Sequence, residues 1–243
     1  MLPKIDVPIY ELKLESQKKK VKFRPFTVKE EKLFLMINEG DDEEGIFNTT
    51  KQVLRNCVLS DIDVDSLPSF DLEYLFLNLR ARSIGEEVKI RFSCNNTVAD
   101  DEGKEKKCNG HVDFDINLLD IKPEKKDGHN TKIELTENLG LVMKYPTADI
   151  IQRYATNTSV DDIIKIIAEC IDFIYDKDEI YYAKDTTFQE LVEWVESLEI
   201  SQLENVKQFF ETMPKLTKKL DFKCPKCGYT EELTLEGLQS FFV

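Results

Sequence analysis

The sequence predicts an α+β fold that is mostly helical and contains a small antiparallel sheet. Apolar residues recur at helical spacing between residues 25 and 85 and again after residue 147. From residue 86 to residue 143, apolar and polar residues alternate, which is typical of half-buried strands. Two cysteines flank a polar loop in this middle stretch, and two more stand in a Cys-Pro-Lys-Cys-Gly turn near the C-terminus. This pattern predicts a zinc-ribbon-like four-cysteine metal site.

The composition limits the classes of protein to which the chain can belong. With 41% apolar and 10% aromatic residues, the chain can bury a sizeable core. It has no run of about eighteen apolar residues and no N-terminal signal pattern, so we expect a soluble cytoplasmic protein that does not bind membranes. Six cysteines without an export signal favour reduced thiols and metal ligation. The net charge of −14 counts against a general nucleic-acid binder.

The same patterns divide the chain into five parts. Pro3 and Pro8 disfavour a central strand near the N-terminus and favour an extended arm. We therefore predict an extended N-terminal arm (1–24) and an N-terminal helical region (25–85). A β-hairpin and sheet region with half of the metal site (86–146) and a C-terminal helical region (147–215) follow. Residues 216–243 form a ribbon knuckle and a C-terminal segment, which are expected to pack on residues 86–146.

Three helices are predicted in the N-terminal helical region. Thr27 and Glu30 stand three residues apart before an apolar stretch, which is the pattern of a capping box at a helix start. A second helix is predicted from about Ile46 to Leu59. The third opens at Leu67 and ends near Gly85, with its apolar residues at helical spacing.

The alternating stretch predicts a hairpin and two further strands. Val88, Ile90 and Phe92 share one face of the first strand, and the alternation resumes at residues 111–116 after the polar loop 95–107. Residues 133–135 and 141–143 predict two more strands. Together these segments predict one antiparallel sheet of about four strands.

Helical spacing returns after residue 147, and the knuckle follows. Three pairs of residues have the spacing of capping boxes and each predict a helix: Ser159 with Asp162, Thr187 with Glu190, and Ser201 with Glu204. The first of these helices is expected to run through Ile174 and to bury Cys170 in the core. Residues 230–235 are predicted as a return strand after the knuckle.

The positions of the cysteines predict the four metal ligands. Antiparallel pairing of residues 88–92 with 112–116 would bring Cys94 and Cys108 to one end of the hairpin. The interval between them is longer than the roughly two to four residues of a standard ribbon. Cys224 and Cys227 supply the other two thiolates, because two cysteines two residues apart before a glycine form a knuckle that can hold one ion.

Several alternatives to this ligand set remain open. His111 stands three residues after Cys108 and would replace one cysteine in a three-cysteine site. Iron, alone or as a cluster, is also compatible with four thiolates, and a chain without metal is the remaining alternative. Cys57 lies within an apolar helical stretch and is expected to be a buried free thiol.

The sequence contains no pattern that indicates catalysis. It has only two histidines and no HExxH, nucleophile elbow, phosphate loop or GxGxxG motif. Its many carboxylates include no pair that stands out as an acid and a base. We therefore expect a protein that is not an enzyme, in which the metal serves folding.

Four stretches along the chain resemble one known family. They are Val7-Pro-Ile-Tyr-Glu-Leu, Phe23-Arg-Pro-Phe-Thr-Val-Lys-Glu-Glu-Lys, LPSFDLEYLFLNLRARSIGE from residue 67 to residue 86, and the terminal Cys-Pro-Lys-Cys-Gly with its final Phe-Phe. They occur in order from end to end of the chain. The sequence thus resembles the baseplate hub protein family of T4-like bacteriophages, the T4 bacteriophage base plate protein family.

This resemblance implies a structural or assembly protein of the central hub and spike in the tail baseplate of a contractile-tailed phage. Its partners would be other hub and spike proteins and not nucleic acid, within an oligomeric assembly. It would be made in the host cytoplasm and act at the virion tail baseplate. Family members are described as hub subunits or as hub assembly factors, and both roles stay open here.

The competing hypothesis is a zinc-ribbon regulator that binds nucleic acid. Its support is a set of lysines close to the cysteines: Lys104, Lys106, Lys107, Lys223 and Lys226. The acidic net charge and the lack of a basic stripe count against it.

Overall fold

The computed structural model describes residues 5–18, 20–36, 43–99, 104–154 and 159–241. The protein is 38% helical and 28% strand, so the prediction of a mostly helical chain with one small sheet was wrong. Seven α-helices and several small sheets lie within these ranges. The predicted return strand is present at Thr230–Glu236. Additional strands come from its partner Lys215–Lys223 and from residues 171–182, where helical spacing was misleading.

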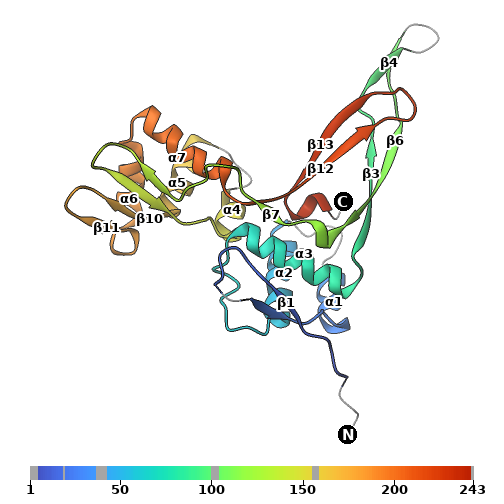
Figure 1. The fold of residues 1–243 in the computed structure, drawn as a ribbon, viewed down its shortest axis with the longest axis horizontal. Coiled ribbons are helices and arrows are strands. Elements are labelled where there is room, and N and C mark those ends of the chain that lie inside the picture. Colours follow the sequence, from blue (N-terminus) through green and yellow to red (C-terminus); the bar gives the residue numbers. More distant parts are fainter. Residues whose placement is uncertain (1–4, 19, 37–42, 100–103, 155–158, 242–243) are drawn as a thin grey trace.

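The molecule has three parts, which point away from a common junction (Figure 1). An N-terminal lobe contains residues 5–85. A ribbon is made of residues 86–117 together with residues 215–237 and projects from the top of that lobe. A second lobe, residues 129–213, projects to the other side. No helix in the described ranges is long and apolar enough to cross a membrane.

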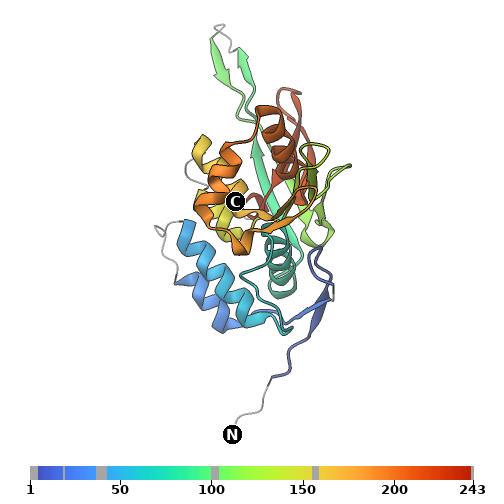
Figure 2. The same ribbon diagram turned by 90° about the vertical axis from the view of Figure 1, so that its left-hand side faces the viewer.

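The N-terminal lobe is built around one buried helix, α3 (Ser69–Ser83). Leu75, Leu77 and Leu79 on this helix are completely buried, because neighbouring elements cover it on most sides. These neighbours are β1 (Tyr10–Leu12), β2 (Val21–Phe23), α1 (Val28–Leu35) and α2 (Glu43–Cys57). Residues 5–9 extend away from the lobe, as both ribbon views show (Figures 1 and 2).

Two polar interactions fix the local structure of this lobe. The expected capping box is present, since Glu30 accepts hydrogen bonds from the backbone N–H of Thr27 at 2.8 Å and from its hydroxyl at 2.7 Å. Asp71 is fully buried and accepts hydrogen bonds from the backbone N–H groups of Glu15 and Ser16, at 3.0 and 2.8 Å. Asp71 therefore attaches the segment after β1 to α3.

The ribbon consists of two long antiparallel hairpins. β3 (Glu87–Ser93) pairs with β6 (His111–Asn117), so the predicted hairpin is present. The loop between them carries a short ladder of β4 (Thr97–Ala99) and β5 (Glu105–Lys107). β12 (Lys215–Lys223) pairs with β13 (Thr230–Glu236), and the turn η3 (Leu238–Phe241) follows.

The prediction of one sheet across residues 86–143 was wrong, because the chain changes direction after β6. The turn η1 (Leu118–Asp120) leads onto α3, and Leu118 and Ile121 are almost completely buried there. β7 (Pro123–Glu124) then pairs with β12. The two later strands therefore belong to another sheet in the second lobe.

That second sheet has the strand order β11-β10-β9-β8. Its strands are β8 (Lys132–Glu134), β9 (Gly140–Met143), β10 (Ile171–Tyr175) and β11 (Ile180–Tyr182). The other elements of the lobe are α4 (Ala148–Tyr154), α5 (Val160–Glu169), η2 (Ala183–Asp185), α6 (Phe188–Glu196) and α7 (Ile200–Thr212). Apolar residues of α5, α6 and α7 share one core cluster with the sheet.

The helix predicted to run through Ile174 ends earlier, at Glu169. Ile171 and Ile174 lie in β10, yet both are buried because the pairing register shifts between Ile171 and Phe173. This irregularity lets residues three apart face the same core, which imitates helical spacing. Cys170 is buried as expected, at the C-cap of α5.

Two of the three later capping boxes are present as predicted. They join Ser159 to Asp162 and Thr187 to Glu190. The third was wrong in position, because α7 is capped by Glu199 instead of Ser201.

Candidate metal centre

The first two candidate ligands lie where the strands of the β3-β6 hairpin end. Ser93 pairs with His111 in the antiparallel ladder, so Cys94 directly follows β3 on the side where Cys108 precedes β6. The backbone N–H of Cys94 donates to the carbonyl of Gly110 at 2.7 Å, and that of Cys108 donates to the carbonyl of Asn96 at 2.8 Å. These bonds hold both cysteines at one end of the hairpin.

The other two candidate ligands lie in the turn between β12 and β13. The backbone N–H of Cys224 donates to the carbonyl of Tyr229 at 2.8 Å, and that of Gly228 donates to the carbonyl of Cys224 at 3.0 Å. Gly228 has a φ of 76°, in the left-handed region that a residue with a Cβ adopts only at a cost. The knuckle therefore closes tightly, as the sequence predicted.

The four sulfur atoms of Cys94, Cys108, Cys224 and Cys227 all lie within 4.8 Å of one another. The Cys94 and Cys227 sulfurs are 3.7 Å apart, and those of Cys108 and Cys224 are 3.6 Å apart. A tetrahedron of sulfurs at about 2.3 Å from a central zinc ion has edges of about 3.8 Å. The spacing of the thiols therefore fits one tetrahedrally coordinated ion.

The cluster is enclosed by apolar side chains. Cys94, Cys108 and Cys224 are buried, and Cys227 is partly exposed. The apolar residues around them come from both hairpins: Phe92, Val98, Val112, Phe114, Phe222 and Leu233. An ion held by four thiolates in this enclosure would have no open coordination position, which is typical of structural sites and not of catalytic ones.

Comparison with known families identifies the chain. The family model described as "T4 bacteriophage base plate protein" matches residues 7–243, nearly the whole sequence. This chain belongs to that family. The resemblance predicted from the sequence is thereby confirmed, and the family places the protein in the virion tail baseplate. No curated protein and no solved structure matches the chain.

In this baseplate protein, hydrogen bonds favour the thiolate form of the knuckle cysteines. The backbone N–H of Tyr229 and the side-chain amide of Asn96 lower the pKa of Cys227 to about 6. The Asn96 amide nitrogen lies 3.6 Å from the Cys227 sulfur. The backbone N–H groups of Cys227 and Lys226 lower the pKa of Cys224 in the same way. Both thiols therefore ionise more readily, and the thiolate is the form that binds a metal cation.

In this baseplate protein, the surroundings of Cys94 and Cys108 favour the protonated thiol instead. Burial raises the pKa of Cys94 to about 12 and also raises the pKa of Cys108. Burial thus favours the protonated form of both thiols, and a cation would offset this effect by compensating the charge of the thiolates. A divalent ion would supply that compensation at the centre of the cluster.

Gly110 is a functional residue that the sequence analysis missed. A Cβ at this position would lie 2.5 Å from the Cys224 sulfur and 3.5 Å from the Cys108 sulfur. The close approach of the two hairpins therefore requires a glycine here. The only signal in the sequence was the Cys108-Asn-Gly string, and an asparagine followed by a glycine is equally typical of an ordinary turn.

The other candidate residues do not join the cluster. His111, the alternative ligand, is exposed at the start of β6, and its ring nitrogens are not among the donor atoms that lie together. Burial raises the pKa of Cys57 to about 11 and that of Cys170 to about 12, as in core thiols. Lys226 donates to the carbonyl of Cys108 at 2.8 Å, so this lysine links the knuckle to the other hairpin.

Proposed function

We propose that the protein is a structural or assembly subunit of the central hub and spike of the baseplate. The observation that carries this proposal is the family match over residues 7–243. Within the assembly the protein acts by docking with other hub and spike proteins. It contributes no catalytic step. A bound zinc ion joins the two hairpins of its ribbon.

The spacing of the cluster fits a single ion such as zinc better than an iron–sulfur cluster. Four sulfur atoms within 4.8 Å of one another, with two of the pairs separated by 3.7 and 3.6 Å, suit one small divalent ion. An iron–sulfur cluster would need more room, because its thiolates bind different iron atoms. Bound zinc would join two hairpins that are more than a hundred residues apart in sequence, and its binding free energy would become folding free energy.

The surface supplies suitable docking elements. Ile5, Val7 and Ile9 alternate along the extended N-terminal arm and are 88%, 38% and 60% exposed. β11 is one of the two edge strands of its sheet, and its residues Ile180 and Tyr181 are exposed. An extended arm and a free strand edge with exposed β-branched and aromatic side chains suit addition to the sheet of a partner.

The composition of purified tails tests this function. Mass spectrometry of intact tails and of hub intermediates should detect the chain together with hub and spike proteins. Its presence in tails would identify a retained subunit, and its presence in intermediates alone would identify an assembly factor. Absence from both would contradict the proposal.

A filter-binding titration addresses the competing regulator hypothesis. We expect no tight binding to single-stranded or duplex nucleic acid at low salt, because the chain carries a net charge of −14. Tight, salt-dependent binding would favour a regulator and count against a docking subunit.

A further inference from the structure

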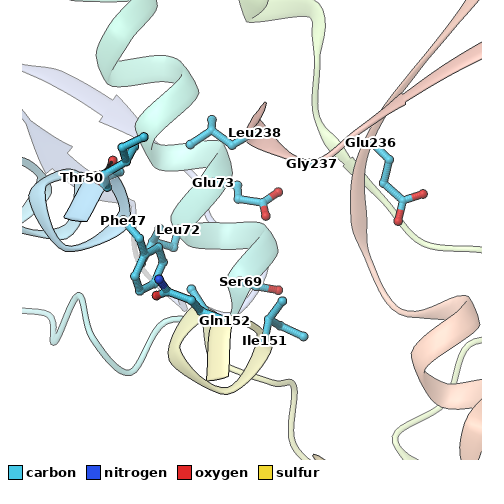
Figure 3. A pocket seen from close by; sticks show the side chains of 12 residues that line it. Phe47, Thr50, Ser69, Leu72, Glu73, Ile151, Gln152, Glu236, Gly237 and Leu238 are labelled. Carbon is cyan, nitrogen blue, oxygen red and sulfur yellow. Dashed lines mark hydrogen bonds between the residues drawn. The ribbon is translucent and has the colours of Figure 1, made fainter. Parts of the chain in front are cut away.

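A cavity of about 270 Å³ lies where the three parts of the molecule meet (Figure 3). Its walls come from α2 and α3 of the N-terminal lobe, from α4, and from the turn after β13. Four apolar side chains dominate these walls: Phe47, Leu72, Ile151 and Leu238. Ile46 and Ile151 are 49% and 40% exposed, so the cavity also has an apolar rim that faces solvent.

Two carboxylates line this largely apolar cavity, those of Glu73 and Glu236. Glu73 projects from α3 toward the cavity, as the close view shows (Figure 3). Within the described part of the chain, its carboxylate has no hydrogen-bond or ion-pair partner. Burial and the nearby charge of Glu236 raise the pKa of Glu73 to about 7. An ionised carboxylate at this position therefore lacks a compensating cation.

The neighbouring lysines are already used by other carboxylates. Lys215 on β12 pairs with Glu236 at 2.9 Å. Lys51 on α2 pairs with Asp65 at 2.7 Å and with Asp149 at 2.6 Å. No basic side chain lines the cavity among the described residues. The described residues of the cavity therefore supply no cation to neutralise Glu73, and a partner protein can supply it.

We propose that the cavity receives one lysine or arginine side chain from another baseplate protein. The cationic head of that side chain pairs with Glu73, and its aliphatic stem lies against Phe47, Leu72 and Leu238. The volume is slightly below the roughly 300–1,000 Å³ of typical small-molecule sites, which suits a single inserted side chain. The inference rests on the proposed docking function and names the chemistry of one contact.

Two small amides test the cavity on the full-length chain. The probes are N-acetyl-lysine N-methylamide and N-acetyl-norleucine N-methylamide, which has a similar stem without the charge. With ¹³C-labelled glutamate, the lysine amide should shift the Glu73 carboxyl signal in a saturable manner. The norleucine amide should bind at least about tenfold more weakly, because it cannot make a charged hydrogen bond.

Matched variants separate the carboxylate from general effects. Glu73→Gln should weaken binding of the lysine amide at least about tenfold, and Glu73→Asp should retain most of it, because the charge is kept. Glu231→Gln, an exposed position on β13, should bind like the unmodified chain. Amide NMR spectra of each variant report whether it is folded. Equal binding of both amides, or full binding by a folded Glu73→Gln chain, would overturn the inference.

Tail composition distinguishes this inference from the function on which it rests. If the protein is found in tails but neither amide binds, the cavity inference fails and the docking function stands. If the lysine amide binds but the chain is absent from tails and hub intermediates, the docking function fails, and the assignment of a baseplate partner fails with it. Presence in tails with selective, Glu73-dependent binding of the lysine amide supports both.

Discussion

The ribbon and the second lobe both contain antiparallel strands, but they are stabilised in different ways. The sheet of the second lobe packs against α5, α6 and α7, and residues such as Leu141, Ile167 and Ile171 are almost completely buried. No helix in the described part of the chain covers the outer part of the ribbon (Figure 1), and the buried residues of the cluster there are Phe222 and three cysteines. We therefore expect the lobe to be stabilised mainly by apolar burial, and the ribbon to depend on the proposed zinc ion.

The strand ladders of the ribbon are the reason for this expectation. An isolated two-stranded hairpin is at best marginally stable in water. Every second residue of β3, β6 and β13 faces solvent, and the cross-strand ion pairs there are exposed, as between Lys89 and Asp115. Exposed ion pairs contribute little to stability. The base of the ribbon shares the core of the N-terminal lobe, so a metal ion would add stability at the outer end of both hairpins, where apolar burial is small.

The largest effect is expected from removal of a ligand. Cys224→Ser should abolish stoichiometric zinc binding and open the ribbon, because structural zinc sites contribute about 10 kcal/mol or more of apparent binding free energy. The second lobe should stay folded. Metal analysis, together with hydrogen exchange of β3 and β12 against β9 and β10, measures both results.

A neighbouring substitution supplies the control for this experiment. Lys223 is exposed beside Cys224, so Lys223→Gln should keep both the metal and the slow exchange of the ribbon. An unchanged metal content and melting temperature in Cys224→Ser would show that the cysteines do not hold a structural ion.

The next largest effect is expected from the core of the second lobe. Leu141 is fully buried on β9, so Leu141→Ala should lower the free energy of unfolding by about 2–5 kcal/mol. Its zinc content should stay unchanged, because the ligands lie in the ribbon. Urea unfolding and metal analysis test this pair of results. Ile180→Ala, at a half-exposed position of the same sheet, should have a much smaller effect.

Loss of zinc from Leu141→Ala would contradict the comparison between the two regions. It would mean that they unfold together and that the lobe supports the metal site. Retention of zinc at urea concentrations that unfold the lobe would strengthen the distinction.

A third prediction concerns Glu73, where the N-terminal lobe meets the end of the ribbon. Its folded pKa of about 7 lies above the ordinary value of 4.5, so its contribution to stability is present below pH 4.5 and is lost as the pH rises through 7. Glu73→Gln removes this dependence. At pH 8 it should therefore stabilise the chain by up to about 3 kcal/mol, with little effect at pH 4.5.

Unfolding at both pH values, with Glu231→Gln as the exposed control, measures this difference. A stabilisation of equal size at both pH values would mean that the charge of Glu73 is not its cause. It would then reflect packing of the amide in the cavity.

The parts of the fold that depend on neighbouring residues were predictable from the sequence. The Thr27 and Glu30 capping box and the knuckle at Cys224 are set by residues within a few positions of each other. The β3-β6 hairpin was also found, because its alternation fixes which face is buried. The proximity of Cys94 and Cys108 follows from the same register.

The remaining features depend on contacts between distant segments. The pairing of β9 with β10 joins residues on either side of two helices, and the irregular register at Ile171 disguised that strand as helix. Gly110 is required only because a sulfur from the other hairpin lies against it. The cavity around Glu73 is formed by four separate segments, so periodicity along the chain could not reveal it.

The smallest effect is expected from a surface ion pair of the ribbon. Lys219 on β12 lies 2.7 Å from Glu232 on β13, but their side chains are 70% and 54% exposed. Glu232 raises the pKa of Lys219, so the attraction is present below the ordinary lysine pKa of 10.5 and is lost only in stronger alkali. Water and salt screen such a pair, so Lys219→Gln should leave the unfolding midpoint at pH 7 unchanged.

The adjacent residue gives a strict comparison on the same strand. Leu220 is 9% exposed and faces the apolar cluster at the base of the ribbon, so Leu220→Ala should lower the unfolding midpoint clearly. If Lys219→Gln were as destabilising as Leu220→Ala, cross-strand charge pairs would hold the ribbon together. The metal would then be less important, because a ribbon held by charge pairs should weaken with rising salt and keep its ladder when zinc is removed.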